Sequence, residues 1–310
     1  MYLLYSLAHL VKYNYGMYFS KIVVIYNPNN TGSGRQMADD FIRDIKRKLP
    51  SQSVALVATE HAGHAEEIAY RMSKTKGRPL VVSSSGDGGY NEVINGIMKA
   101  KSEGFSPVAG LIPAGNANDH HRSLNTKDIV EAVVAGEVQK IDLLELRYAE
   151  GEDTQSRFAH SYIGVGLTSK VGRELNKSKL NVIKEIFIAG RVFFNAKPTK
   201  LRVDGEINRY DSIVFSNIDS MSKYIQLSKE SSVTDGKFEV TELKSRYKLK
   251  ILSALVKSTL VGFDQGVHTS EFRFETVNKT SIQVDGEIIA LTPGSTVVVS
   301  SRKQILECIV

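Results

Sequence analysis

The sequence predicts an α/β domain with a largely parallel sheet, followed by a β-rich antiparallel domain. From Lys21 to about Lys140, short apolar runs alternate with helical patterns, which is typical of a parallel sheet with helices on both faces. After Lys140, strand-like runs dominate, and Asp-Gly turns separate several of them. We therefore expect an N-terminal extension at 1–20, an α/β domain at 21–140 and a β-rich domain at 141–310.

The α/β domain is predicted to open with an apolar strand at 22–26. The next segment places Met37, Phe41, Ile45 and Leu49 four residues apart, which forms the apolar stripe of a helix. The same criteria predict strands at 54–58, 80–82 and 108–112, and helices at 65–72 and 91–99.

In the β-rich domain, two helical patterns at 182–194 and 248–260 interrupt the strands, and the last run, 304–310, is expected to return to one of the domains. The predicted turns are Asp204-Gly205, Asp235-Gly236 and Asp285-Gly286. The predicted strands are 141–146, 158–165, 200–203, 212–216, 238–243, 272–274, 281–284 and 296–299.

Composition is that of a globular protein, with 42% apolar and 24% charged residues among 310. A single cysteine, Cys308, excludes an internal disulfide framework and fits a reducing compartment, which favours the cytoplasm. No segment reaches the roughly 18 apolar residues needed to span a bilayer. The apolar start, 1–11, lacks the basic front end and cleavage site of a secretory signal. It is either a surface-lying helix or sequence upstream of a true start at Met17.

The net charge of +6 suggests an anionic partner. No nucleic-acid-binding signature accompanies the basic residues, which leaves anionic lipid or nucleotide phosphates. Solvated helix faces explain each single lysine equally well. The basic residues cluster at Lys170, Arg173, Lys177, Lys179 and Lys184, and at Lys244, Arg246, Lys248, Lys250 and Lys257.

The most informative segment is 85–96, where three glycines surround Asp87 directly after an apolar run. Glycine lets backbone N–H groups approach a phosphate, and the following helix N-terminus adds partial positive charge. Asp87 would repel phosphate unless it acts through a metal ion or accepts a proton from an attacking hydroxyl. The combination suggests phosphoryl transfer. The alternative is a purely structural turn, but the Asn91-Glu92 and Asn95-Gly96 pairs that follow favour function.

Other glycine- and asparagine-rich patches also follow predicted strands, at Asn27-Pro28 and Gly115-Asn116. In α/β sheets, ligands gather beyond the carboxyl ends of the strands. The familiar nucleotide signatures are absent: there is no Walker sequence, and the Gly-x-Gly pairs at 32–34 and 164–166 lack a third glycine.

At these residues the chain resembles the diacylglycerol kinase catalytic domain family, which includes bacterial soluble lipid kinases and is related to sphingosine kinases and NAD kinases. Residues 86–96 resemble its Gly-Asp-Gly-Thr-x-Asn-Glu-Val-x-Asn-Gly signature. Three further stretches match in order: 25–32 its Asn-Pro-x-Ser-Gly loop, 111–124 its Pro-x-Gly-Thr-x-Asn-Asp segment, and 283–287 its Asp-Gly-Glu.

The resemblance implies that ATP phosphates bind at the strand ends of the first domain. Thr59 and Asn116 stand at two positions where the family has threonines that contact the nucleotide. The implied nucleotide-binding residues are Asn27, Pro28, Asn29, Asn30, Thr31, Thr59, Ser85, Gly86, Asp87, Gly88, Gly89, Tyr90, Asn91, Glu92, Gly115 and Asn116.

The resemblance also implies the catalytic and metal residues. Glu287 matches the general base that accepts the proton of the lipid hydroxyl, Asp87 lies near the metal or is itself the base, and Asp285 orients the site. A Mg²⁺ site, partly of main-chain carbonyls, is implied at Ser232, Asp235 and Lys237. A second Val-Asp-Gly-Glu copy, at 203–206, is interpreted as a turn.

The chain departs from the family at Gly89 and Asn116, where the signature has threonines that could bind phosphate. Asn116 can still donate through its amide, but Gly89 has only its backbone N–H. His120-His121 replaces an apolar or aromatic pair. These two histidines, like His61 and His64, lack the convergent ligands of a zinc site and are expected to be solvated or locally hydrogen-bonded.

These observations predict an ATP- and Mg²⁺-dependent lipid kinase of phospholipid metabolism, acting on diacylglycerol or a similar neutral lipid. Its active site is expected in the cleft between the domains. A cytoplasmic protein that visits the inner membrane face, with no nucleic-acid partner, follows from the same view. The alternatives are an NAD kinase-like enzyme with a soluble acceptor and a non-catalytic nucleotide- or lipid-binding regulator. A homodimer is left open.

Overall fold

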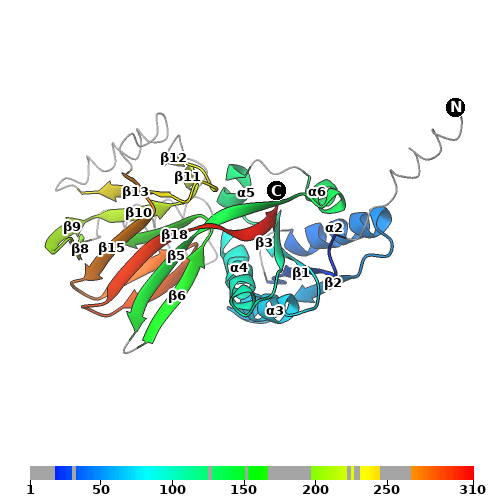
Figure 1. The fold of residues 1–310 in the computed structure, drawn as a ribbon, viewed down its shortest axis with the longest axis horizontal. Coiled ribbons are helices and arrows are strands. Elements are labelled where there is room, and N and C mark those ends of the chain that lie inside the picture. Colours follow the sequence, from blue (N-terminus) through cyan, green and yellow to red (C-terminus); the bar gives the residue numbers. More distant parts are fainter. Residues whose placement is uncertain are drawn as a thin grey trace, which may run out of the picture. The chain divides into compact units, whose positions relative to one another are not determined.

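The computed structural model describes residues 18–29, 33–124, 128–150, 153–166, 197–221, 225–226, 231–244 and 267–310 (Figure 1). The chain divides into two compact units. The first consists of residues 1–116, 124–139 and 307–310, and the second of residues 117–123 and 140–306. The helices predicted at 182–194 and 248–260 lie outside the described residues, as do 1–17 and all the clustered basic residues except Lys244.

The first unit is built on four parallel strands in the order β2-β1-β3-β4. Tyr26 pairs with both Ala58 and Ser84, and Ser85 pairs with Pro113, so the carboxyl ends of all four strands meet at one edge. The elements are β1 (Ile22–Tyr26), α2 (Gly34–Lys48), β2 (Val54–Ala58), α3 (His64–Ser73), β3 (Leu80–Ser85), α4 (Asp87–Ser102), β4 (Val108–Pro113) and α6 (Ile129–Ala135).

The core of this unit lies between the sheet and its helices. The stripe predicted for the first helix packs there, because Phe41 and Ile45 of α2 join the core residues of β1, β3 and β4. The end of the long strand β18 (Thr296–Ile309) joins the same sheet, where Cys308 pairs in parallel with Ala109 of β4. Runs 296–299 and 304–310 of the sequence are thus parts of one strand.

The start of α4 differs from the sequence prediction. The apolar period placed the helix at 91–99, but it begins at Asp87, with Gly86 in an extended conformation as its N-cap. Gly88 and Gly89 therefore form part of its first turn. The pattern missed this turn because glycines and an aspartate carry no apolar period and have low helix propensity.

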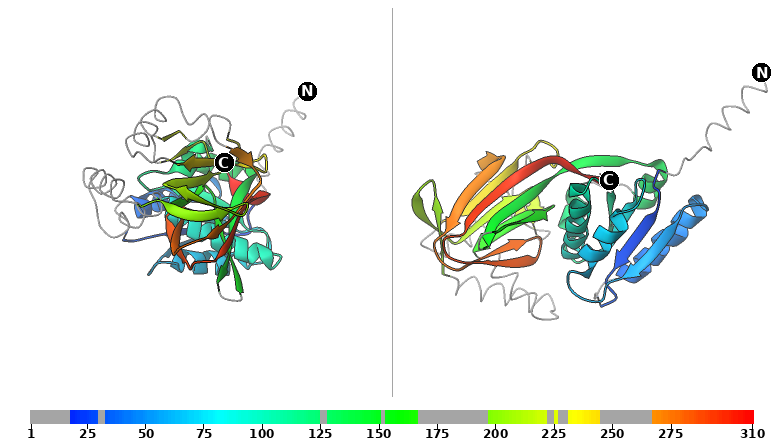
Figure 2. Two further views of the ribbon diagram at one scale, coloured as in Figure 1. Left: turned by 90° about the vertical axis from the view of Figure 1, so that its left-hand side faces the viewer. Right: turned by 60° about the horizontal axis from the view of Figure 1, so that its bottom comes forward.

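The second unit contains antiparallel sheets. One has the order β14-β13-β10-β7-β16-β17, and in the other β18, β15, β8 and β9 are neighbours. The strand β5 pairs with β6 and with β18, and Figure 2 shows β18 in red alongside β5 in green. The elements are α5 (Asp119–Ser123), β5 (Val138–Glu150), β6 (Asp153–Ala159), β7 (Tyr162–Gly166), β8 (Thr199–Val203), β9 (Glu206–Tyr210), β10 (Ser212–Ser216), β11 (Ser220–Met221), β12 (Ile225–Gln226), β13 (Phe238–Leu243), β14 (Val267–Thr269), β15 (Glu271–Thr276), β16 (Thr280–Val284) and β17 (Glu287–Leu291).

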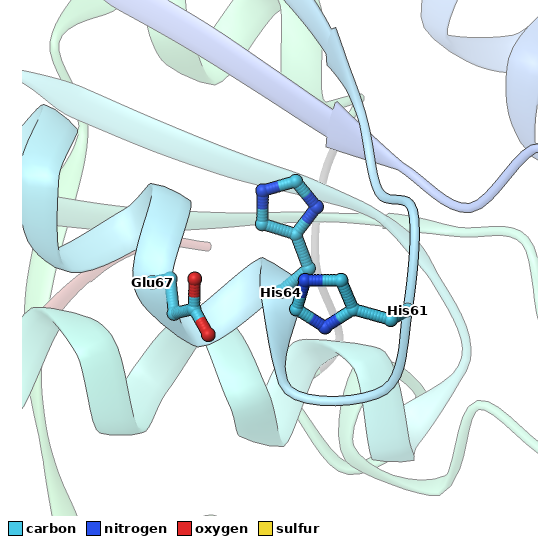
Figure 3. Close-up of side chains that lie close together, drawn as sticks. All are labelled: His61, His64 and Glu67. Atoms are coloured by element: carbon cyan, nitrogen blue, oxygen red, sulfur yellow. The ribbon is translucent and has the colours of Figure 1, made fainter.

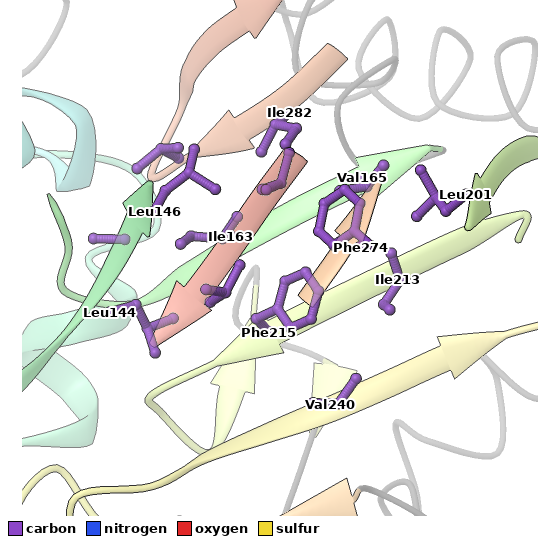
Figure 4. Close-up of a cluster of buried hydrophobic side chains, with 14 of the residues drawn as sticks. Leu144, Leu146, Ile163, Val165, Leu201, Ile213, Phe215, Val240, Phe274 and Ile282 are labelled. Carbon is purple, nitrogen blue, oxygen red and sulfur yellow. The ribbon is translucent and has the colours of Figure 1, made fainter. Parts of the chain in front are cut away.

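Aromatic and branched side chains from these strands form one core (Figure 4). Phe215 lies at its centre, with its ring 5.2 Å from that of Phe272 and 6.2 Å from that of Phe274.

Among the described residues of the chain, none of the helices has the length and apolar content needed to cross a bilayer.

Two of the predicted Asp-Gly turns are two-residue hairpins. Asp204-Gly205 joins β8 to β9, and Asp285-Gly286 joins β16 to β17, with positive φ at all four residues. This is the conformation for which Asp-Gly is favoured. The single strand predicted at 158–165 is wrong, because the chain bends at His160-Ser161 and separates β6 from β7. Both bend residues are fully buried although their side chains are polar.

Candidate functional site

Three of the motifs converge at the strand-end edge of the first unit. The amide of Thr59 donates to the carbonyl of Tyr26 at 2.9 Å, and the amide of Ala114 donates to that of Ser85 at 3.0 Å. Gly86 lies so close to Gly115 that a Cβ added to it would be 3.1 Å from the Cα of Gly115. The loops after β1, β2, β3 and β4 therefore form one continuous surface, as expected for a ligand site of an α/β sheet.

The loop after β1 starts with a local turn. The amide of Asn29 donates to the side-chain oxygen of Asn27 at 2.8 Å. Asn30 and Thr31, also predicted to bind nucleotide, lie outside the described residues. Arg35, in the first turn of α2, lies over the Tyr26 ring and donates to its hydroxyl at 3.0 Å. Arg35 adds a cation that the motif comparison missed, although its place right after the loop was visible in the sequence.

The glycine-rich segment presents its first turn to solvent and buries the next. Gly88 is exposed, and Asp87 and Gly89 are partly exposed. Tyr90 and Asn91 are each only 1% exposed, and burial raises the pKa of the Tyr90 hydroxyl well above its ordinary value. Their predicted nucleotide contacts stay a prediction, and such contacts fit the backbone of this turn better than these two side chains.

The later residues of the motif hold α4 against α3. The carboxylate of Glu92 accepts a hydrogen bond from the amide of Ala65, in the first turn of α3, at 3.2 Å. A Cβ on Gly96 would lie 2.3 Å from the carbonyl oxygen of Glu66 and 2.8 Å from the Cβ of Ala69. Both Glu92 and Gly96 thus have structural contacts that explain their residue types.

His61, His64 and Glu67 gather where α3 begins (Figure 3), with their ligand atoms within 4.8 Å of one another. The backbone amide of Glu60 donates to Nδ1 of His64 at 3.0 Å, which leaves the proton of the neutral ring on Nε2. The two rings also stack, 10° from parallel, so their lone pairs cannot converge on one ion in this arrangement. The cluster therefore does not form a preorganised metal site.

In the second unit, Glu287 is the first residue of β17 and 42% of its side chain is exposed. Arg157 of β6 donates to the same oxygen, Oε2, from Nε at 3.1 Å and from Nη2 at 2.5 Å. The sequence analysis missed Arg157, and no local signal marks it, because it lies 130 residues from its partner.

Asp285 is fully buried in the same hairpin. Its carboxylate accepts hydrogen bonds from the amides of His160 at 2.6 Å, Tyr162 at 2.9 Å and Ser161 at 3.3 Å, and lies 3.3 Å from Nε2 of His160. Burial raises the pKa of Asp285, while His160 and the three amides act in the opposite direction. Asp285 therefore ties the Asp-Gly turn to the bend between β6 and β7, which holds Glu287 next to Arg157.

His160 also contacts His120 of α5, with the ring centroids 4.5 Å apart and the rings edge to face. His120 is completely buried, so the expectation of a solvated histidine is wrong at this position. Burial, and then the neighbouring His160 and His121, lower its pKa well below the ordinary value. His120 therefore occupies a core position that suits the apolar or aromatic residue of the family.

The predicted metal residues lie in the loop before β13. Asp235 Oδ1 accepts from the amide of Lys237 at 2.9 Å, and Oδ2 lies 3.4 Å from Nε2 of His268. Asp142 of β5 holds this loop, because its carboxylate accepts from the amides of Gly236 at 2.5 Å and Gln304 at 2.6 Å. Burial raises the pKa of Asp142 against the effect of these two amides.

The comparisons with known proteins agree with the motifs. The family model of the diacylglycerol kinase catalytic domain matches residues 21–146. A diacylglycerol kinase of Bacillus subtilis (strain 168) is 24% identical over 292 residues, which cover 87% of this chain and 91% of the relative. One of Staphylococcus saprophyticus is 29% identical over 230 residues, 69% of this chain and 70% of the relative.

Solved structures show the fold. A crystal structure of a diacylglycerol kinase from Bacillus anthracis has a TM-score of 0.68 at 18% identity, covering 94% of this chain and 97% of that one. Yeast NADH kinase has a TM-score of 0.51 at 13% identity, covering 93% and 83%. The predicted fold class is confirmed: a mostly parallel α/β domain and an antiparallel β-rich domain.

Asp87 belongs to the first unit and Glu287 to the second, so their predicted meeting in one active site stays a prediction. The similarity to the family does not require Asp87 and Glu287 to lie close together, because the matched segment contains the three motifs that converge in the first unit. Residues 21–146 of this chain therefore match the diacylglycerol kinase catalytic domain, and the resemblance that the motifs predicted is confirmed.

Proposed function

We propose that this protein is an ATP-dependent lipid kinase that transfers the γ-phosphoryl group to a hydroxyl of diacylglycerol or a similar neutral lipid. The match of the catalytic domain model to residues 21–146 carries the proposal, because this segment contains the converging strand-end loops. Curated relatives named diacylglycerol kinase support the same acceptor, since the similarity to one of them extends over 91% of its length.

The ATP phosphates are proposed to bind at the edge formed by Asn27–Asn29, Gly86–Gly89 and Gly115-Asn116. The exposed first turn of α4 offers backbone N–H groups and the positive end of a helix of 16 residues. Arg35, beside the first loop, adds a positive charge that a triphosphate would attract.

The loop at Ser232, Asp235 and Lys237 fits a Mg²⁺ ion by the chemistry of its donors. Asp235 offers a carboxylate that is 31% exposed, whereas Lys237 can contribute only its main-chain carbonyl because its side chain is a cation. Bound there, the ion would neutralise phosphate charge during transfer. Asp87, at the start of α4, is proposed to lie near the metal.

Glu287 is proposed as the general base. The two hydrogen bonds that Glu287 accepts from Arg157 both go to Oε2, so Oε1 lies outside this contact. That oxygen would accept the proton of the lipid hydroxyl while the hydroxyl oxygen attacks the γ-phosphorus and the bond to the ADP leaving group breaks. Asp87 is the rival candidate for this proton transfer.

The acceptor is a lipid, so we propose a cytoplasmic protein that works at the inner membrane face. Basic side chains at such a surface add about 1 kcal/mol each to binding of anionic lipid. Membrane visits therefore need no spanning helix, only reversible contact with the bilayer.

Purified protein, Mg²⁺ and ATP labelled in the γ-phosphate test the proposal when offered diacylglycerol vesicles, a total lipid extract or NAD. Label in phosphatidic acid supports it, label in NADP indicates a soluble acceptor, and label in no product indicates a regulator. Glu287→Gln should lose turnover by roughly 100-fold or more, with ATP binding nearly unchanged, because only proton transfer is removed. Equal turnover in both proteins would remove Glu287 from the role of base.

A further inference from the structure

Gly89 has a steric reason to be glycine in this chain. It lies in the first turn of helix α4, where the backbone has ordinary helical angles that L residues adopt. A Cβ added there would lie only 2.6 Å from Oγ and 2.8 Å from Cβ of Ser85. Contacts this short do not occur, so the side chain of Ser85 already fills the space that a side chain at 89 would need.

The side chain of Ser85 places a hydroxyl in this space. It is the last residue of β3 and is 7% exposed. Its Oγ lies 2.7 Å from Oγ of Ser83 and donates to the carbonyl of Gly86 at 2.9 Å. A hydroxyl therefore stands at the junction of β3 and α4, only 2.6 Å from the place that the Cβ of a threonine at position 89 would take.

We infer that Ser85 is the phosphate-binding hydroxyl of this protein, in place of the threonine that the signature has at position 89. The inference rests on the proposed function, because it assigns a ligand contact within the same nucleotide site. On binding, the proton of Ser85 Oγ turns from the carbonyl of Gly86 to a phosphate oxygen. Hydrogen bonds to charged acceptors are about twice as strong as neutral ones, which favours this exchange.

The inference makes the two positions dependent on each other. Threonine at 89 is tolerated only when residue 85 lacks a side chain, and a hydroxyl is needed at one of the two positions. Alanine at 85 separates these requirements, because it removes Oγ but keeps the Cβ that lies 2.8 Å from the added atom.

Five variants test this in the full-length protein: Ser85→Gly, Ser85→Ala, Gly89→Thr, and the double variants Ser85→Gly/Gly89→Thr and Ser85→Ala/Gly89→Thr. Calorimetric titration with MgATP gives Kd without any lipid, and thermal unfolding gives Tm. Serine removal by either single variant should weaken MgATP binding about tenfold, the value of a hydrogen bond to a charged group. Gly89→Thr alone should lower both Tm and affinity.

Ser85→Gly/Gly89→Thr should return Kd to within about threefold of the wild-type value and recover Tm, whereas Ser85→Ala/Gly89→Thr should remain impaired in both, since the Cβ of alanine still blocks the threonine. Unchanged Kd in both serine variants would overturn the hydroxyl assignment. Gly89→Thr with wild-type Tm and Kd would overturn the steric dependence. Wild-type protein that binds no MgATP would overturn the inference, while binding without transfer to any lipid would overturn only the proposed acceptor.

Discussion

Three residues of the second unit make different contacts at the Asp-Gly-Glu turn. Asp285 is buried and binds backbone amides, Glu287 is partly exposed, and Arg157 reaches Glu287 with two donors. Two carboxylates separated by one residue thus have different environments, one suited to holding the chain and the other to meeting a substrate. The resemblance implied an orienting role for Asp285 and a catalytic role for Glu287, but it gave no sign of Arg157, because it supplies residue types and no contacts.

Removing the guanidinium should impair the proposed base without unfolding the protein. Arg157→Ala is expected to lower kcat about tenfold, because Glu287 then loses its two-donor contact and samples several rotamers. Arg157→Lys, which keeps the charge but not the fork, should recover part of the loss. Steady-state kinetics with Tm as a control test this; full activity in the alanine variant would deny Arg157 a positioning role.

Asp285→Asn should destabilise the fold rather than only reduce turnover. The amide would direct donors toward backbone N–H groups that now meet a carboxylate, which leaves buried groups unsatisfied at a cost of about 1–3 kcal/mol each. Urea unfolding is expected to show a clear loss, whereas Glu287→Gln, two residues away and 42% exposed, should unfold as the wild type does. Similar midpoints for Asp285→Asn and wild type would contradict the anchoring role.

Helix α4 combines a partly exposed first turn with a tightly packed body. Its first turn is glycine-rich and partly exposed, and its middle packs closely on α3 through Gly96. Glycine in both places lowers helix propensity, which the buried face of Val93, Ile94 and Ile97 compensates. One stretch of sequence therefore contains the proposed phosphate site at its start and a close helix contact seven to ten residues later.

Gly96→Ala tests the close contact of α3 and α4. Alanine favours a helix by about 1 kcal/mol, but its Cβ would lie 2.3 Å from the carbonyl oxygen of Glu66, so the helices must move apart. We expect a net loss of about 1–3 kcal/mol in the free energy of unfolding. The exposed Gly88→Ala in the same helix is the matched control and should not lose stability. A Gly96→Ala protein as stable as this control would refute the contact.

At the scale of the whole molecule, the chain enters the second unit near Lys140 through β5 and returns through β18. The last four residues, 307–310, belong to the first unit, where Cys308 is completely buried and pairs with Ala109. The first unit therefore contains residues that precede the second unit and residues that follow it, and its sheet includes Cys308 only after the chain has passed through the second unit.

The reactivity of the Cys308 thiol shows whether the end of β18 stays in the sheet of the first unit. Burial raises the pKa of its thiol to about 12, so a thiol reagent at pH 8 should not modify the native protein but should modify it fully in denaturant. The rate of modification measures the exposure of the end of β18. The Cys308→Ala variant, which has no thiol, is the control. Rapid modification of native protein would mean that the end of β18 does not remain in the sheet.

The raised pKa of the same thiol predicts that the free energy of unfolding falls at alkaline pH. Its folded pKa, about 12, lies above the ordinary value of 9.0, so its stabilising contribution is full below pH 9 and is lost as pH rises toward 12. The loss is about 1.4 kcal/mol per pH unit in that window. Cys308→Ala should show a shallower decline of unfolding free energy between pH 9 and 11 than the wild type, and parallel curves would contradict this.

Local pattern was enough for much of the first unit. Strands 22–26 and 54–58 are found at their predicted bounds, because each is a continuous apolar run between polar segments. The Asp-Gly hairpins at 204–205 and 285–286 were also predictable, since Asp-Gly between two strand-like runs favours a two-residue turn with positive φ. The phosphate-site hypothesis came from the same kind of local signal, glycines directly after a strand.

Contacts between distant residues were decided only by the tertiary structure. Arg157 and Glu287, Asp285 and the 160–162 bend, and Cys308 and Ala109 each lie more than 100 residues apart in the chain, where no periodicity relates them. The bend at His160-Ser161 is invisible because its residues are buried like those of a strand. By itself the sequence determined which residue types stand at which strand ends, and hence the site that is proposed. Only the tertiary structure decided which side chains contact one another, because packing and backbone hydrogen bonds depend on residues from distant parts of the chain.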